Sequence, residues 1–262
     1  MSELIKTIRS DKGTLTITLN RPEVHNAFND EVIASISALF DEIERVGGVN
    51  LVVITGEGKS FCAGADLNWM KSMINFSQEE NIEDSKKLAD MFKKIDECKV
   101  PVIGKVNGHA LGGGVGLLAV CDYVLAKDGS KFGFTEVNLG LIPAIISPFC
   151  IRKIGVSQAR ALFISGEKFD ANRGKEINLI HQVFSEDEFE IKSNEFIAHL
   201  ETLPRKAKAN SKNLIKQVIS LPESEVCAFT CLAIANQRVS AEGQEGMSAL
   251  LEKRQPNWNK HD

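Results

Sequence analysis

The stretch that decides the fold is ALGGG at residues 110–114, and a second glycine-bearing turn, FCAGAD, occupies residues 61–66. Each turn follows an apolar, strand-like run and opens a segment with a helical pattern. The first N–H groups of a helix have no intrahelical acceptor, and they lie at the positive end of the helix dipole. Two such turns, if the fold brings them together, can direct two N–H donors at one oxygen atom, as stabilisation of an enolate requires.

Apolar periodicity around these turns predicts an α/β fold. Uninterrupted apolar runs favour buried strands that pair in parallel, and the rhythm of strand, strand and helix repeats imprecisely. Asn29 or Asp30 is suited to cap the first helix. The expected strands are residues 4–8, 15–19, 51–55, 102–106 and 123–126, with helices at residues 30–46 and after Gly112.

Strand patterns end near residue 185, and the rest of the chain has helical patterns. The expected helices are residues 186–200, 206–219, 224–239 and 243–252. Pro204 and Pro222 separate some of them, since proline interrupts a helix. We therefore expect a core at residues 1–200 and a helical region at residues 201–262, with no flexible linker between them.

Composition restricts the class of protein. The chain has 262 residues, of which 43% are hydrophobic and 25% are charged, and this balance excludes global disorder. A net charge of −4 argues against a general nucleic-acid binder. The lysine-rich residues 205–216 are the local exception, and we interpret them as a solvated helix face.

The six cysteines indicate a reducing compartment. They are scattered, they form no C-x-x-C pair, and several lie in apolar runs, so buried free thiols are expected rather than disulfides or a metal site. The first residues lack the apolar core of a signal peptide, and the longest apolar stretch is too short to span a bilayer. We expect a soluble, cytoplasmic protein with no membrane partner.

Nucleotide-binding motifs do not fit the glycine-rich turns. No lysine follows residues 112–114 as a P-loop requires, and a G-x-G-x-x-G motif needs glycine where Leu117 stands. Phosphate binding by these turns is therefore not expected.

Four blocks in the same order resemble the enoyl-CoA hydratase/isomerase, or crotonase, superfamily. They are LNRP with NAF (residues 19–22 and 26–28), FCAGADL (61–67), VNGHALGGG (106–114), and EGMSA with EKR (245–249 and 252–254). The resemblance implies a ββα spiral core with a C-terminal helical trimerisation region, and assembly as a homotrimer or a dimer of trimers. It also implies an acyl-CoA thioester substrate, with coenzyme A as part of the substrate, no separate cofactor, no metal and no nucleic acid.

The resemblance assigns roles by position. The backbone N–H groups of Ala65 and Gly113 would bind the thioester oxygen, and Lys253 would reach the coenzyme A phosphate of an adjoining subunit. Val24 and His25 would line the coenzyme A path. The full set of implied substrate-binding positions is Val24, His25, Ala63, Asp66, Leu67, Gly112, Gly116, Pro143 and Lys253.

Glu136 is the expected acid/base. It lies in FGFTEVNLG at residues 132–140, the segment that matches one glutamate of the superfamily. Burial among Phe132, Phe134, Val137 and Leu139 would disfavour the charged carboxylate and raise its pKa, which suits a group that takes and returns a proton. The alternative is a carboxylate that only complements a helix dipole.

One position departs from the pattern of two-glutamate hydratases. Gly116 stands where they carry the other glutamate, so the usual pair of carboxylates is absent. Residues 65–71 and 140–148 resemble a bacterial methylglutaconyl-CoA hydratase-like branch, in which this glycine also occurs. Gly116 is expected to add room for a branched or carboxylated acyl group, and the bulky residues 145–147 to reshape the pocket, which Trp69 and Met70 are candidates to line.

These residues favour hydration of a branched 2-enoyl-CoA. Two alternatives stay open at this level: an enoyl-CoA isomerase that uses Glu136 alone, and a non-catalytic homologue that binds acyl-CoA or RNA.

Overall fold

The computed structural model describes residues 4–259 of the chain. It divides into two compact units, each described here by itself. The first unit runs to Cys98 and continues over Val102–Asn194, and the second comprises Lys99–Pro101 and the residues from Glu195 onward. This division falls within one helix, α7 (Glu186–Glu201), whereas the sequence prediction placed the boundary between residues 200 and 201.

Two sheets form the first unit. The larger one has the strand order β1–β2–β3–β5–β7–β10, in which only the β1–β2 pair is antiparallel. Its strands are β1 (Ile5–Arg9), β2 (Thr14–Leu19), β3 (Leu51–Gly56), β5 (Val102–Val106), β7 (Tyr123–Lys127) and β10 (Gln182–Phe184). Parallel pairing of buried strands, predicted from the apolar runs, is confirmed.

The smaller sheet runs in the order β4–β6–β8–β9, and its last pair is antiparallel. Its strands are β4 (Ser60–Cys62), β6 (His109–Leu111), β8 (Lys131–Gly133) and β9 (Lys168–Asp170). Each repeat places one strand in the large sheet and the next in the small one: β3 then β4, β5 then β6, β7 then β8. This alternation is the predicted ββα spiral.

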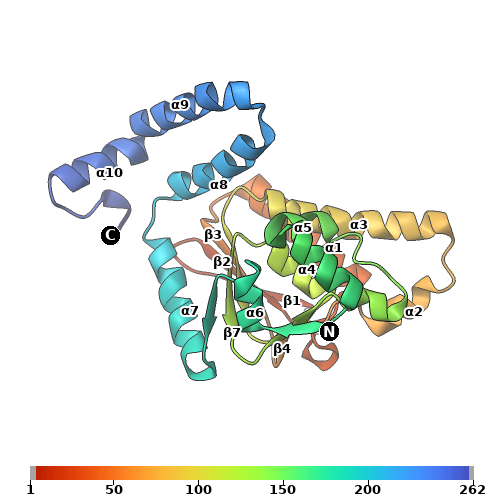
Figure 1. Cartoon of the computed structure of the whole chain (residues 1–262). Coiled ribbons are helices and arrows are strands. Elements are labelled where there is room, and N and C mark those ends of the chain that lie inside the picture. Colours follow the sequence, from red (N-terminus) through yellow and green to blue (C-terminus); the bar gives the residue numbers. More distant parts are fainter. Residues whose placement is uncertain (1–3, 260–262) are drawn as a thin grey trace. The chain divides into compact units, whose positions relative to one another are not determined.

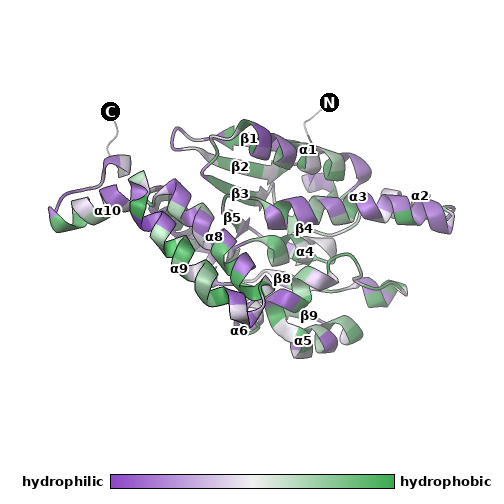
Figure 2. Cartoon of the chain, turned by 90° about the horizontal axis from the view of Figure 1, so that it is seen from above, coloured by the Kyte–Doolittle hydropathy of each residue, from purple (hydrophilic) through white to green (hydrophobic). Residues whose placement is uncertain are grey.

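Helices cover the sheets, and α1, α3, α4 and α5 lie together beside them (Figure 1). The helices of this unit are α1 (Asp30–Val46), α2 (Leu67–Met73), α3 (Gln78–Glu97), α4 (Gly113–Val120), α5 (Ser147–Ser165) and α6 (Ala171–Glu176), with short 3-10 helices η1 (Pro22–Val24) and η2 (Glu136–Leu139). The Asn29 side chain caps α1 by accepting from Val32 N–H at 2.9 Å, as the sequence predicts. Hydrophobic residues follow the central strands (Figure 2).

The cysteines are free, as predicted. Cys62, Cys98, Cys121 and Cys150 are buried, whereas Cys227 and Cys231 are exposed. Burial raises the pKa of the Cys62 thiol to about 12, so this thiol is unreactive. Among residues 4–259, no cluster of three or more potential metal ligands occurs, and no helix is long and apolar enough to cross a bilayer.

The second unit is helical, with α8 (Arg205–Ser220), α9 (Glu223–Val239), α10 (Ala241–Leu251) and the 3-10 helix η3 (Asn257–Asn259). Glu242 fixes the start of α8, because its two carboxylate oxygens accept from the N–H groups of Lys206 and Ala207 at 2.9 Å each. The lysine-rich face is solvated only in part: Lys208 is half-buried and donates to the Leu200 carbonyl. Figure 2 shows hydrophobic residues on α9 as well as polar ones.

Candidate active site

Three neighbouring strands of the small sheet deliver the predicted site residues to one edge. β4 pairs in parallel with β6, and β6 pairs in parallel with β8. The carboxyl ends of parallel strands lie at the same edge of a sheet, so the segments that follow them meet there. Those segments carry Ala65, Gly113 and Glu136 respectively.

In the loop after β4, the two residues that flank Ala65 are hydrogen-bonded to Phe28. Phe28 N–H donates to the Gly64 carbonyl at 2.7 Å, and Asp66 N–H donates to the Phe28 carbonyl at 2.7 Å. This parallel bridge uses the groups on either side of Ala65 and leaves the Ala65 N–H outside the ladder. Ala65 itself is exposed.

The loop after β6 starts a helix at Gly113. Gly112 precedes it with φ of 51°, a conformation that glycine adopts without steric cost. The Gly112 N–H donates to the Gly133 carbonyl of β8 at 2.9 Å, which ties this turn to the strand before Glu136. As the first residue of α4, Gly113 has an N–H without an intrahelical acceptor.

The two loops are in contact with each other. A β-carbon placed on Gly64 would lie 2.9 Å from the Leu111 carbonyl oxygen and 3.5 Å from the Gly113 nitrogen. A β-carbon on Gly114 would overlap the Cys62 carbonyl. Glycine is therefore needed at both positions, because the two backbones approach closely there. Ala65, the other predicted donor, directly follows Gly64 in the first of these loops.

Glu136 stands beside these loops, at the start of η2. A β-carbon on Gly112 would lie 3.2 Å from Glu136 Oε1, so the carboxylate touches the second loop. Its other oxygen, Oε2, is buried and has no hydrogen-bond partner among the described residues. Burial raises the pKa of Glu136 above its ordinary value, while a backbone hydrogen bond opposes the shift in part.

The surroundings of Glu136 differ in part from the prediction. Phe132 and Phe134 are fully buried, as expected, but Val137 and Leu139 are exposed. None of the residues of η2 is buried, so this short 3-10 helix lies at the surface. The contact that the structure gives for the Glu136 carboxylate is with the glycine turn at Gly112.

The raised pKa of Glu136 predicts a pH-dependent cost to stability. Between its ordinary pKa near 4.5 and the raised folded-state value, the folded chain binds more protons than the unfolded chain, so stability falls as pH rises. Glutamine is neutral throughout. We expect Glu136→Gln to increase the free energy of unfolding at pH 8 and to leave it nearly unchanged at pH 4, as measured by urea denaturation.

The exposed Glu176 provides the control for this experiment, since it pairs with Arg173 at the surface. Glu176→Gln is expected to show no such gain at pH 8. Equal effects of Glu136→Gln at both pH values would contradict the pH dependence.

Gly116 does not open room in the pocket, and here the prediction is wrong. A β-carbon on Gly116 would overlap Ile146 Cγ2 and would lie 3.0 Å from both Ile146 Cβ and Phe92 Cζ. Ile146 is 3% exposed and Phe92 is fully buried. The space that a second carboxylate would need is filled by an apolar side chain from the residue that precedes α5.

This apolar side chain and the Glu136 carboxylate each cover one glycine near the start of α4. Gly112 is the residue before α4, and Gly116 lies in the first turn of that helix. Glu136 covers Gly112 and Ile146 covers Gly116. One carboxylate and one hydrocarbon wall thus take the two adjacent places.

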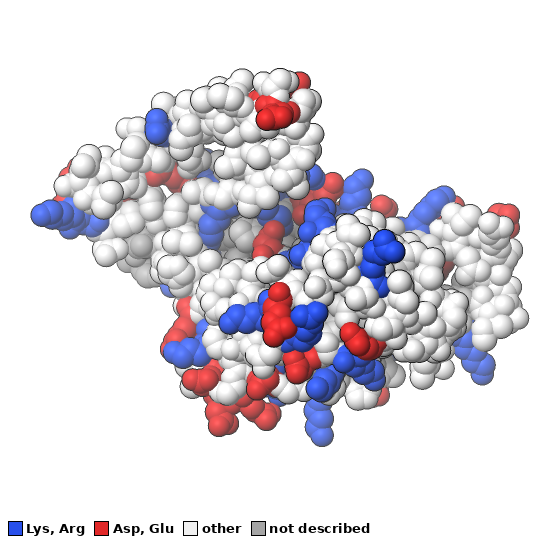
Figure 3. Space-filling model, viewed as in Figure 1, with Lys and Arg blue, Asp and Glu red and all other residues white. Residues whose placement is uncertain are grey.

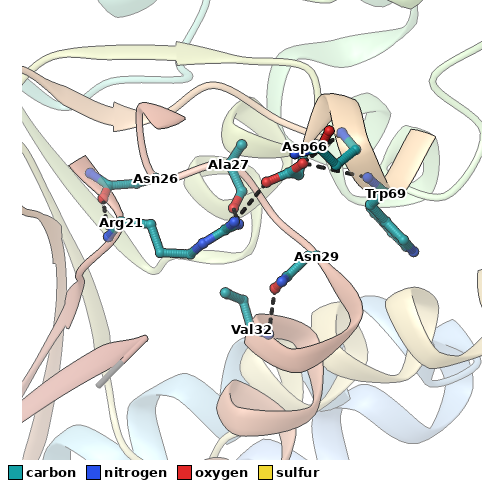
Figure 4. Close-up of polar contacts among 8 residues, drawn as sticks. Arg21, Asn26, Ala27, Asn29, Val32, Asp66 and Trp69 are labelled. Atoms are coloured by element: carbon teal, nitrogen blue, oxygen red, sulfur yellow. Dashed lines mark hydrogen bonds and ion pairs between the residues drawn. The ribbon is translucent and has the colours of Figure 1, made fainter. Parts of the chain in front are cut away.

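Asp66 has a structural use for its side chain. It caps α2 by accepting from the N–H groups of Asn68 and Trp69, and it pairs with Arg21 Nη2 at 2.7 Å (Figure 4). Burial acts to raise the pKa of Asp66, but the hydrogen bonds from Arg21 and from the two N–H groups outweigh it and hold the pKa below its ordinary value. Arg21, which received no role from the sequence, also donates to the Ala27 carbonyl at 2.8 Å.

The remaining predicted positions lie on several different elements. His25 is exposed with φ of 54°; its Nδ1 lies 3.0 Å from Ser60 Oγ, and its carbonyl accepts from Ala63 N–H at 3.0 Å. Leu67 is 80% exposed, whereas Pro143 is buried. Val24 ends η1 and is partly exposed. Lys253 follows α10 in the second unit.

A cavity of about 740 Å³ lies beside α2 and α3, and Trp69 lines it together with Asp66. Most of its other lining side chains are polar or acidic, including Asp84. Ala65, Gly113 and Glu136 are not among the described residues that line it. Asp66, the neighbour of Ala65, thus shares this cavity with Trp69.

Comparison with known proteins identifies the family. The family model described as enoyl-CoA hydratase/isomerase matches residues 9–261. This chain belongs to the enoyl-CoA hydratase/isomerase family. The two glycine loops and the spiral core are thus those of the crotonase superfamily, as the sequence motifs predicted.

Individual members resemble the chain over nearly its whole length. A 2,3-dehydroadipyl-CoA hydratase of Escherichia coli (strain K12) is 32% identical, over 98% of this chain and 99% of the relative. A 1,2-epoxyphenylacetyl-CoA isomerase of the same organism is 31% identical, over 95% of each. A crystal structure of an enoyl-CoA hydratase from Shewanella pealeana matches with a TM-score of 0.91 at 33% identity, covering 98% of this chain and 96% of that one.

These members of the family are named for different reactions although they are nearly equally similar to this chain. The comparison therefore supports a hydratase/isomerase enzyme and does not distinguish between the two reactions. The choice between reactions has to come from the site itself.

Proposed function

We propose that this enzyme adds water to a branched 2-enoyl-CoA of the methylglutaconyl-CoA type. The observation that carries the proposal is the contact of the Gly64–Ala65 and Gly112–Gly113 turns with each other and with Glu136. Two open N–H donors and one half-buried carboxylate are the groups that hydration of a conjugated thioester needs.

In this mechanism the N–H groups of Ala65 and Gly113 donate to the thioester oxygen. They draw electron density away from C3 and stabilise the negative charge that develops on that oxygen. Removal of one such donor typically costs about 2.7–4 kcal/mol of transition-state stabilisation. Both donors belong to the backbone, so they hold their direction without losing side-chain freedom.

Glu136 transfers the proton. Its carboxylate takes a proton from water while the water oxygen forms a bond to C3, and the electron pair of the double bond moves toward C2 and the thioester. Glu136 then returns the proton to C2. The raised pKa of Glu136 favours both steps, because a group that must accept and donate works best with a pKa near the working pH.

A branched acyl group is supported by the resemblance of residues 65–71 and 140–148 to the methylglutaconyl-CoA hydratase-like branch. Val24, His25, Ala63, Leu67 and Pro143 are proposed to contact coenzyme A or the acyl chain, and Asp66 to hold the first loop in place.

Isomerisation is the second candidate, and one observation favours it. Ile146 occupies the place of a second acid, and a single carboxylate is sufficient to move one proton between C2 and C4. Hydration by one carboxylate requires Glu136 to serve both as base and as acid.

We propose a homotrimer or a dimer of trimers in the cytoplasm as the working assembly, with Lys253 binding the coenzyme A phosphate of an adjoining subunit. Exposed apolar side chains on the C-terminal helices support this, among them Ile215, Ile219 and Leu250. The face shown in Figure 3 carries positive and negative side chains side by side and thus gives no support to RNA binding.

A panel of thioesters tests the proposal. Straight, branched and carboxylated 2-enoyl-CoA esters and a 3-enoyl-CoA would be incubated with the enzyme and the products identified by mass. We expect water addition to be fastest with the branched, carboxylated 2-enoyl-CoA, accompanied by loss of the conjugated chromophore.

Appearance of the chromophore from 3-enoyl-CoA, with no water addition to any ester, would replace hydration by isomerisation. Binding of acyl-CoA without any product would leave the non-catalytic homologue as the explanation.

A further inference from the structure

We propose that Phe28 is a positioning residue that sets the separation between the N–H groups of Ala65 and Gly113. The inference rests on the proposed function, because it concerns the geometry of the two donors that bind the thioester oxygen. Phe28 lies outside both glycine loops and follows the LNRP segment, in the stretch that leads into α1.

The backbone of Phe28 fixes the first donor. Its N–H and its carbonyl make two hydrogen bonds of 2.7 Å to Gly64 and Asp66, the residues on either side of Ala65. A peptide whose two neighbours are both tied to one residue has little freedom to rotate. The direction of the Ala65 N–H is therefore set relative to Phe28.

The ring of Phe28 packs against the second donor. A β-carbon on Gly113 would lie 3.1 Å from Phe28 Cε2 and 3.2 Å from Cδ2, so the ring is close against the start of α4. Phe28 is 1% exposed. One residue thus contacts both loops, by its main chain on one side and by its ring on the other.

Neighbouring groups keep the ring from moving away. Phe92 packs edge-on against it, with ring centroids 6.3 Å apart and planes at 85°. Phe92 is itself fully buried and packs against Phe149 of α5 at 6.1 Å. The Phe28 ring is therefore held between α4 and a supported aromatic neighbour.

A second set of bonds restrains the main chain next to Phe28. Arg21 donates to the Ala27 carbonyl at 2.8 Å and pairs with Asp66 at 2.7 Å, so the residue before Phe28 and the residue after Ala65 share one guanidinium (Figure 4). Asn26 donates to the Ser60 carbonyl of β4 at 2.8 Å. Phe28 thereby moves as one body with the first loop, and its ring transmits the position of that loop to Gly113.

Shortening the Phe28 side chain should change the relative position of the Ala65 and Gly113 N–H groups without removing either donor. Leucine at position 28 keeps both backbone hydrogen bonds but leaves space beside Gly113, into which the start of α4 can shift. Hydrogen bonds weaken steeply when distance and angle depart from their optimum. The oxygen would then be bound well by one N–H and poorly by the other.

The test uses Phe28→Leu in the full chain. We expect kcat to fall about tenfold, a fraction of the 10²–10³-fold loss that follows removal of a whole donor. The affinity for 3-methylbutanoyl-CoA, a saturated thioester that cannot be hydrated, should change much less than kcat.

The decisive measurement is the infrared carbonyl band of that thioester, labelled with ¹³C at the carbonyl carbon. In the unmodified enzyme the band should shift to lower frequency on binding, because the two N–H groups polarise the carbonyl. In Phe28→Leu the shift should be clearly smaller. A residue with only a structural role would change stability and leave this band in place.

Phe189→Leu is the matched control. Phe189 is 2% exposed and lies on α7 under Lys105, in an element that contributes to neither loop. Phe189→Leu should lose about as much stability as Phe28→Leu. The carbonyl band of the bound thioester should, however, lie at the same frequency as in the unmodified enzyme. An unchanged band in Phe28→Leu would overturn the inference, whereas no shift in the unmodified enzyme would instead refute the two-donor hole of the proposed function.

Discussion

Glu136→Gln is expected to lower kcat by about 10²–10⁴-fold, the contribution typical of a general acid–base, while leaving the affinity for a saturated acyl-CoA nearly unchanged. An amide has the size of a carboxylate but cannot take a proton from water and return it to carbon. The two N–H donors come from other loops, so thioester binding does not depend on the lost charge. Initial rates and equilibrium binding measure the two effects separately.

Glu176→Gln serves again as the control, because this side chain is exposed on α6 and pairs with Arg173. Its kcat should equal that of the unmodified enzyme. Turnover of Glu136→Gln within a few-fold of that value would remove Glu136 from the chemistry and would require a different acid/base.

The residues proposed for the site could be singled out from the sequence because the features that mark them are local. A glycine turn that opens a helix exposes N–H groups whatever the rest of the chain does. The strand and helix segments were likewise visible: the helix predicted at residues 30–46 is α1 (Asp30–Val46), with the predicted Asn29 cap. Local propensity and apolar periodicity agree in such elements, so these elements can be predicted from the sequence.

The small sheet was not visible in the same way. Each of its four strands has three residues, too few for a period to emerge from the apolar pattern. Yet the register of β4, β6 and β8 is what brings Ala65, Gly113 and Glu136 to one edge. These residues can be proposed from local sequence features. The strand pairing that brings them together depends on segments far apart in the chain, so it cannot be predicted from those features.

Gly116 illustrates the limit most clearly. A glycine in the sequence indicates a missing side chain, but it does not say what occupies the vacated volume. Here Ile146, thirty residues further along the chain, fills it together with Phe92. The same limit applies to Phe28, whose contact with Gly113 has no signal in the local sequence.

The filled space beside Gly116 leads to the second large prediction: Gly116→Glu should sharply destabilise the fold. Overpacking a core typically costs about 1–3 kcal/mol, and burying a carboxylate without a partner adds to that cost. Replacing a helical glycine returns at most about 1 kcal/mol through helix propensity. The unfavourable contributions therefore exceed the favourable one. Urea denaturation should show that the free energy of unfolding falls by at least about 2 kcal/mol.

Three further variants locate the cause. Gly116→Ala retains the overlap with Ile146 Cγ2 without the charge, so it should be destabilised less than Gly116→Glu but still measurably. Ile146→Ala alone should lose about 2–5 kcal/mol, as large-to-small changes in cores do. The two side chains compete for one volume. The double variant Gly116→Ala/Ile146→Ala should therefore lose less free energy of unfolding than the sum of the losses of the two single variants, by about 0.5–3 kcal/mol. Strict additivity would mean that Ile146 does not occupy the place of the second acid, and a two-carboxylate site would then be within reach of a single substitution.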